Sequence, residues 1–175
     1  MDNAGLSYVF GLFLNQLRKN SLMDLDKIDK RLLEMLQEDS TTDIKTISSK
    51  LNLSKTPIYN RIKKFVASGF IKKYVAVLDT TKVEKMMVVF CSVSLEKQKL
   101  KEINEFKKAI QKIPEVVECY LMGGANDFLL KVIVKDLKDY HKFSSEKLAA
   151  LNNISQIKST FVLDEFKRST VIPIY

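Results

Sequence analysis

Histidine, cysteine and tryptophan are scarce in this chain, which has one, two and none of them. Cys91 and Cys119 lie far apart and fit no spacing typical of a metal or redox site, so we expect reduced core thiols and no disulfide. His141 has no acid or nucleophile at a suggestive spacing. A glycine-rich phosphate loop and a nucleophile elbow are also lacking. The sequence therefore predicts a protein that is not an enzyme and that holds no metal or cofactor.

No apolar run is long enough to cross a bilayer. Residues 6–17 are the most apolar part of the N-terminus, but a transmembrane helix needs about 20 such residues. A signal peptide carries its positive charge before the apolar run, whereas here Asp2 precedes it and Arg18 follows it. Met23 opens a segment typical of a natural N-terminus. Residues 1–22 are therefore interpreted as an extension, forming a short amphipathic helix that covers a partner, or as a start assigned too early. We expect a cytoplasmic protein that does not bind membranes.

Acidic residues are absent from residues 44–78. The whole chain has 29 basic and 21 acidic residues, a net charge of +8. The same excess of eight lies within this stretch, on Lys45, Lys50, Lys55, Arg61, Lys63, Lys64, Lys72 and Lys73. Positive charge concentrated in one short segment is typical of contact with a polyanion. A solvated cationic face is the alternative interpretation.

Two short helices are predicted within the basic stretch. Residues 41–43 offer N-caps for the first helix, and Asn52 suits the left-handed conformation in which helices often end. Ser54 can cap the second helix, whose first turn holds Pro57 and which ends before Gly69. Two short helices joined by a tight turn are the pattern of a helix-turn-helix.

The second of these helices has one apolar and one polar face. Ile58, Ile62 and Phe65 recur at helical spacing, and the opposite face is polar and basic. The first turn of such a helix can enter the major groove, while basic residues reach phosphates. We predict that the side chains near base edges are those of Ser54, Thr56, Tyr59 and Asn60, and that phosphates are held by Lys50, Lys55, Arg61, Lys63 and Lys64.

A further helix completes the predicted DNA-binding domain at residues 23–78. Asp24 or Asp26 can cap this helix. Its buried stripe is predicted to comprise Leu25, Ile28, Leu32, Leu33 and Leu36. Residues 70–78 are rich in β-branched and aromatic residues and predict a strand that serves as a wing or an outgoing arm. The polar residues 79–85 are the predicted linker.

The remaining residues, 86–175, predict a second domain of alternating type. Strands are expected at residues 86–95, 116–122, 128–134 and 157–166, helices at 99–113 and 136–151, and a short last strand at 170–174. The order βαββαβ is that of the ferredoxin-like split βαβ sandwich. The predicted fold class is therefore α+β, with a winged-type helix-turn-helix of three helices followed by a ferredoxin-like sandwich.

Two of the predicted strands are apolar on both faces, at residues 87–91, 128–130 and 132–134. A sheet covered by helices on one face should instead alternate apolar and polar residues. Two helices leave the other face uncovered, and monomers rarely expose an apolar patch beyond several hundred Å². We therefore predict a homodimer through this sheet, with roughly 800 Å² buried per partner. Strands that twist or bulge are the alternative explanation.

Several segments together resemble the Lrp/AsnC (feast/famine) transcription regulators. They are residues 24–33 (DLDKIDKRLL), 53–62 (LSKTPIYNRI), 68–74 (SGFIKKY), 118–124 (ECYLMGG) and 127–131 (DFLLK). The resemblance extends from residue 24 to about residue 167. It implies a helix-turn-helix that binds duplex DNA and a ferredoxin-like domain that senses a ligand and pairs the chains. It also implies frequent rings of four dimers, with an amino acid or similar metabolite bound between dimers.

The ligand loop of that family is matched in part. Gly124 and Asp127 occupy its glycine and its second acidic position, whereas Ala125 and Asn126 replace its first acidic and its aromatic residue. Glycines let backbone N–H groups approach a carboxylate, and an Asp carboxylate can pair with an α-ammonium group. The effector-binding residues implied by the resemblance are Met122, Gly124, Asn126, Asp127 and Thr160. A tight β-turn with structural Gly and Asp is the alternative.

Two functions are consistent with these patterns. The first is a sequence-specific transcription regulator whose DNA binding or assembly responds to an amino acid or similar metabolite. The second is an architectural DNA-binding oligomer without an effector. They differ in one respect, because only the regulator changes its DNA affinity or oligomeric state when a metabolite is added.

Overall fold

A computed structural model of the chain describes residues 24–79, 82–83 and 86–175. The predictions for residues 1–22 lie outside these described residues. The chain divides into two units, each described by itself. The helical unit contains the described residues up to Val77 together with Phe166–Tyr175, and the sheet unit contains Leu78–Glu165.

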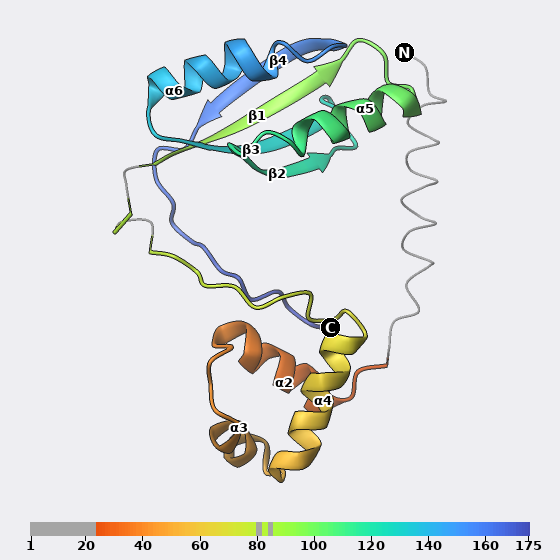
Figure 1. The fold of residues 1–175 in the computed structure, drawn as a ribbon, viewed down its shortest axis with the longest axis vertical. Coiled ribbons are helices and arrows are strands. Elements are labelled where there is room, and N and C mark those ends of the chain that lie inside the picture. The colour runs from red at the N-terminus through yellow and green to blue at the C-terminus, as the bar shows by residue number, and fades with distance from the viewer. Residues whose placement is uncertain (1–23, 80–81, 84–85) are drawn as a thin grey trace. The chain divides into compact units, whose positions relative to one another are not determined.

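Three helices of the helical unit carry the predicted helix-turn-helix (Figure 1). They are α2 at Lys27–Glu38, α3 at Ile44–Leu51 and α4 at Lys55–Ala67. The caps of α2 and α3 are the predicted ones, since the side chain of Asp26 caps α2 and that of Asp43 accepts from the N–H groups of Lys45 and Thr46 at the start of α3. Asn52 ends α3 at φ 52° and Gly69 follows α4 at φ +78°, both in the left-handed region.

The core of the helical unit differs from the prediction at three positions of α2. The buried hydrophobic residues are Leu32, Leu33, Met35, Ile47, Ile58 and Phe65. Met35 lies in this core instead of Ile28, which is only half-buried. Asp29 is also buried, with 8 % of its surface exposed. Among the described residues, it is the one charged residue that is buried.

Two predicted strands are absent from the described residues. Residues 70–78 form no strand, and the exposed Tyr74, Val75 and Val77 have no neighbouring strand to pair with. A strand needs a partner to accept its backbone hydrogen bonds, so strand propensity alone leaves this segment an irregular outgoing arm. Residues 170–174 also form no strand, and Phe166–Tyr175 belongs to the helical unit instead of the predicted second domain.

The sheet unit has the predicted βαββαβ order. Its elements are β1 at Met87–Leu95, α5 at Leu100–Ile110, β2 at Val116–Leu121, β3 at Phe128–Val134, α6 at Leu137–Lys142, the π-helix η1 at Phe143–Leu148 and β4 at Ile154–Phe161. The strands form one antiparallel sheet in the order β2-β3-β1-β4. The fold class is therefore confirmed, whereas the helix predicted at 136–151 changes to π geometry after Lys142.

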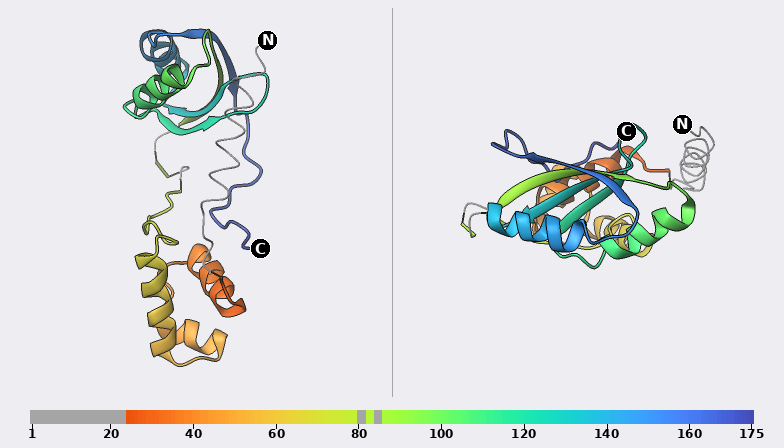
Figure 2. Two further views of the ribbon diagram at one scale, coloured as in Figure 1. Left: turned by 90° about the vertical axis from the view of Figure 1, so that its right-hand side faces the viewer. Right: turned by 90° about the horizontal axis from the view of Figure 1, so that it is seen from above.

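Both helices of the sheet unit lie on one face of the sheet (Figure 2). That face forms the core, where alternate residues such as Val89, Leu130 and Val132 are fully buried. The opposite face carries the intervening apolar residues of the two central strands, Val88 and Phe90 on β1 and Leu129 and Ile133 on β3. The prediction that these strands are apolar on both faces is confirmed, and no helix covers the second face among the described residues.

Candidate DNA interface and effector loop

The polar face of α4 is exposed because its apolar face is anchored in the core. Ile58 and Phe65 are buried against α2 and α3. The predicted base-reading residues therefore all project away from the unit, and Tyr59 has 59 % of its surface exposed. The exposed set comprises Ser54, Thr56, Tyr59 and Asn60.

Ser54 precedes α4 in the extended conformation of an N-cap, yet its hydroxyl makes no capping hydrogen bond. In most helices with Ser at this position, the hydroxyl oxygen accepts from a first-turn N–H group. Here the Ser54 hydroxyl accepts no hydrogen bond from the N–H groups of the first turn of α4. They are available to an anion, because helix N-termini favour negative charge.

Lysines along α4 and in the last turn of α3 have no acidic partners among the described residues. Lys50, Lys55, Lys63 and Lys64 are exposed, and none of them forms an ion pair within the described part of the chain. Uncompensated charges attract phosphates over distances of about a Debye length. The ammonium groups of these four lysines are therefore free to contact phosphates, as predicted for them.

Arg61 is placed differently from its lysine neighbours. Its Nη1 donates to Asp26 Oδ2 at 2.8 Å and to Asp29 Oδ1 at 2.5 Å. The hydrogen bonds that it donates to the carboxylates of Asp29 and then Asp26 raise the pKa of the guanidinium above its usual range. The predicted phosphate contact for Arg61 is therefore not supported, since its guanidinium fixes α4 to the start of α2. Sequence reasoning missed this because both partners lie more than 30 residues away.

The loop between β2 and β3 contains four of the five predicted effector residues. The Asp127 carboxylate oxygen Oδ2 accepts from the N–H of Leu95 at 2.7 Å, and the Asp127 N–H donates to Val93 O at 3.0 Å. The N–H of Met122 donates to Asp127 O at 2.8 Å and closes the hairpin. Asp127 therefore has a structural role in the single chain, although Oδ1 has no hydrogen bond among the described residues.

The glycines of this loop are not required by its own geometry. Gly123 and Gly124 lie outside the left-handed region, and a Cβ atom on either would meet nothing within 4 Å. Their backbone is therefore open to an approaching group, whereas Asn126 accepts from the Ser94 hydroxyl at 3.4 Å.

Thr160 is not brought to this loop within one chain. It lies on β4 opposite Phe90, and β1 and β3 separate β4 from β2 in the sheet. The single chain thus assembles Met122, Gly124, Asn126 and Asp127 but leaves Thr160 on the far side of two strands.

The two thiols and the histidine show no reactive arrangement in the described residues. Cys91 is buried with its Sγ 3.5 Å from Tyr140 Oη, and burial raises its pKa. Cys119 is exposed, so its prediction as a core thiol is wrong, and both cysteines are free. His141 is exposed on α6. The described residues contain no cluster of three metal-ligating side chains, and none of their helices is long and apolar enough to span a bilayer.

Comparison with known proteins decides the family. Residues 88–172 match the model of the Lrp/AsnC ligand binding domain, and residues 25–72 match that of a winged helix-turn-helix DNA-binding domain. The chain belongs to the Lrp/AsnC family. The helical unit of this Lrp/AsnC regulator thus carries its DNA-binding domain, and its sheet unit carries the ligand-binding domain. Residues 1–24 lie outside both matches.

Relatives with known names cover nearly the same length. The proline dehydrogenase transcriptional activator of Rhizobium radiobacter is 38 % identical over 149 residues, which cover 85 % of this chain and 95 % of the relative. The leucine-responsive regulatory protein of Escherichia coli strain K12 is 32 % identical over 152 residues, which cover 87 % of this chain and 93 % of that one.

Solved structures agree with this assignment. A transcriptional regulator from Neisseria meningitidis in complex with L-Met is 29 % identical with a TM-score of 0.80, and the match covers 86 % of this chain and 97 % of that one. An AsnC family regulator from Agrobacterium tumefaciens is 35 % identical with a TM-score of 0.80, over 85 % of this chain and 97 % of that one. The Lrp/AsnC regulator therefore shares its fold with proteins of the same family.

Proposed function

We propose that this Lrp/AsnC regulator reads duplex DNA with the exposed face of α4 and that an amino acid or similar metabolite changes its DNA binding or its assembly. The observation that carries the proposal is the uncompensated positive charge along α4 and at the end of α3. Base edges are contacted by Ser54, Thr56, Tyr59 and Asn60, and phosphates are held by Lys50, Lys55, Lys63 and Lys64. Arg61 is left out of this set and positions α4.

The chemistry of these side chains fits the major groove. Asn60 can make two hydrogen bonds with adenine, and the Ser54 and Thr56 hydroxyls can donate or accept at either base type. Lysine is a compact cation and carries no base information when it contacts a phosphate. The exposed face of α4 therefore combines side chains that distinguish base pairs with lysines that bind phosphates of any sequence.

We further propose that the uncovered face of the sheet pairs two copies. Phe90 and Ile133 lie near its middle and would be buried by a second sheet of the same kind. The dimer would present two α4 helices, and two-fold proteins bind half-sites one helical turn apart, about 34 Å, or multiples of that spacing. Family resemblance extends this assembly to rings of four dimers.

The effector is proposed to be an amino acid bound where copies meet. Two relatives support that class, one by its name as leucine-responsive and one by its complex with L-Met. The open backbone of Gly123 and Gly124 can approach a carboxylate, and Asp127 Oδ1 can accept from an ammonium group. Because Thr160 is remote within one chain, another copy would supply it to the site.

An architectural DNA binder without an effector is the second candidate. The two are separated by measuring DNA affinity and assembly mass with each of the twenty amino acids added. We expect at least one amino acid to change either quantity several-fold, whereas no change with any of them would favour the architectural protein. The proposed regulator is not an enzyme, needs no cofactor and works in the cytoplasm, where its DNA is.

A further inference from the structure

The last residues of the chain dock on the DNA-binding domain through one side chain of α2. Gln37 Nε2 donates to Ile172 O at 3.3 Å, and the N–H of Ile172 donates to Gln37 Oε1 at 2.8 Å. A single side-chain amide thus satisfies both polar groups of one backbone residue, as a neighbouring strand would. The two residues lie 135 positions apart in the sequence.

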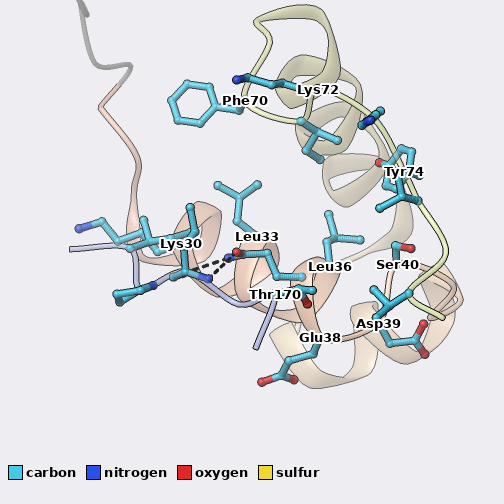
Figure 3. Close-up of a pocket in the computed structure, with 18 of the residues that line it drawn as sticks. Lys30, Leu33, Leu36, Glu38, Asp39, Ser40, Phe70, Lys72, Tyr74 and Thr170 are labelled. Carbon is cyan, nitrogen blue, oxygen red and sulfur yellow. Dashed lines mark hydrogen bonds between the residues drawn. The ribbon is translucent and has the colours of Figure 1, made fainter. Parts of the chain in front are cut away.

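This contact borders an apolar groove of the helical unit (Figure 3). The groove has a volume of about 1360 Å³ and lies between α2, residues 70–77 and the tail. Leu33 and Leu36 of α2 point into it, with Phe70 and Tyr74 on the opposite wall. Ile174 of the tail packs on the core of this unit. The tail therefore occupies one side of a larger apolar groove.

The docked tail is held by few contacts. Ile172 keeps 68 % of its surface exposed and Tyr175 keeps 97 %, so Ile174 is the main apolar anchor. A peptide attached so lightly binds weakly when free in solution, but a short tether gives it an effective concentration on the order of millimolar. Weak attachment of this kind favours exchange between a docked and a released state.

We propose that residues 170–175 form a releasable latch on the DNA-binding domain, with the Gln37 side chain as its catch. The chain passes from the helical unit to the sheet unit after Val77 and returns after Glu165. One covalent segment always joins the units, and the closed latch adds a second connection through the docked tail. In the closed state, α4 can take fewer orientations relative to the sheet unit. Less conformational entropy is therefore lost when two half-sites are bound.

The latch also has a route to the proposed effector site. The tail follows β4, which carries Thr160, and only residues 162–169 separate β4 from the latch. A ligand that moves the end of β4 would change the closed population. This consequence rests on the proposed effector response, but the docking itself does not.

Hydrogen exchange of the full-length protein tests the docking without DNA or effector. Gln37→Ala should raise exchange in residues 168–175 several-fold while leaving the sheet unit unchanged. The matched control is Gln111→Ala, a glutamine at the C-cap of α5 in the sheet unit. Tail exchange that is equally fast in the unmodified chain and in both variants would overturn the latch. The proposed function would still stand in that case if substitutions on α4 abolish DNA binding.

A mixing experiment identifies the occupant. The Gln37→Ala chain keeps its tail and the chain ending at residue 169 keeps its groove, so only docking between copies can protect the tail in their mixture. We expect tail exchange to stay fast in the mixture, because the latch closes within one chain. Recovered protection would show a tail that serves a second copy and would overturn the proposal.

Discussion

Arg61 on α4 donates to the Asp29 carboxylate on α2, with Nη1 2.5 Å from Oδ1. The same carboxylate takes part in the capping box of α2, where Asp29 Oδ2 accepts from the N–H of Asp26 and Asp26 Oδ1 accepts from the N–H of Asp29. One ion pair therefore fixes the start of the first helix against the middle of the DNA-contacting helix. The orientation of the reading face depends on it.

Arg61→Ala should destabilise the helical unit by about 2 kcal/mol, because it leaves the buried Asp29 carboxylate without its cation. Urea denaturation measures the change in the free energy of unfolding. Lys63→Ala, two residues along α4 and exposed, is the control and should change stability by less than about 0.5 kcal/mol. Equal stability of the two variants would contradict the structural role of Arg61.

The stability of the helical unit should fall at acid pH. Hydrogen bonds from the N–H of Asp29 lower the pKa of Asp26, and the Thr46 hydroxyl and N–H lower that of Asp43, both from an ordinary value of 3.8. A lowered pKa means that the unfolded chain binds more protons, so the stabilisation is present above pH 3.8 and lost as pH falls through the folded-state value. Melting temperatures between pH 2 and pH 6 measure the loss.

Asp43→Asn keeps a capping oxygen but has no charge to titrate. Its melting temperature should therefore depend less on pH than that of the unmodified chain. If the melting temperatures of both proteins depend on pH in the same way, Asp43 does not contribute to the loss of stability in acid.

Phe90→Lys should separate the proposed dimer, because it places a second cation on the uncovered face of the sheet, opposite Lys131, which already pairs with Glu118. Sedimentation velocity should show a smaller species, and DNA affinity should fall by at least tenfold as paired binding is lost. Gln111→Lys adds the same charge after α5, away from that face, and should change neither quantity. An unchanged sedimentation coefficient for Phe90→Lys would contradict pairing through the sheet.

Asp127 allows structural and effector roles to be separated. Asp127→Asn keeps an oxygen that can accept from the N–H of Leu95, so stability should hold while the amino-acid response weakens at least tenfold. Asp127→Ala removes that acceptor and should cost about 1–2 kcal/mol of stability. Thermal unfolding and the effector titration together check both statements. A full amino-acid response from Asp127→Asn would leave Asp127 with a structural role alone.

Local signals in the sequence predicted the helical elements well. Asp43 caps α3 and Asn52 ends it because both use contacts within a few residues, which a spacing pattern contains. The βαββαβ order of strands and helices was predicted from local patterns for the same reason. Prediction of the buried face of α2 failed at Ile28, Met35 and Asp29, and the burial of Asp29 depends on its contact with Arg61 of α4.

Contacts between distant residues were not predictable in this way. Arg61 reads as one more cation of a basic helix until Asp26 and Asp29 are seen beside it. Residues 70–78 have the composition of a strand, but composition does not supply the partner that a strand requires. The tail at residues 170–174 likewise pairs with the side chain of Gln37 and not with a strand.

Fluorescence anisotropy with duplex DNA from the regulator's own upstream region tests the central claim most directly. Asn60→Ala should cost about 1–3 kcal/mol on the preferred sequence and little on random DNA, whereas Lys63→Ala should weaken both and lower the salt slope by about 1. Gln111→Ala is the control. Binding by both α4 variants that matches the unmodified protein on both DNAs and at every salt concentration would contradict the account.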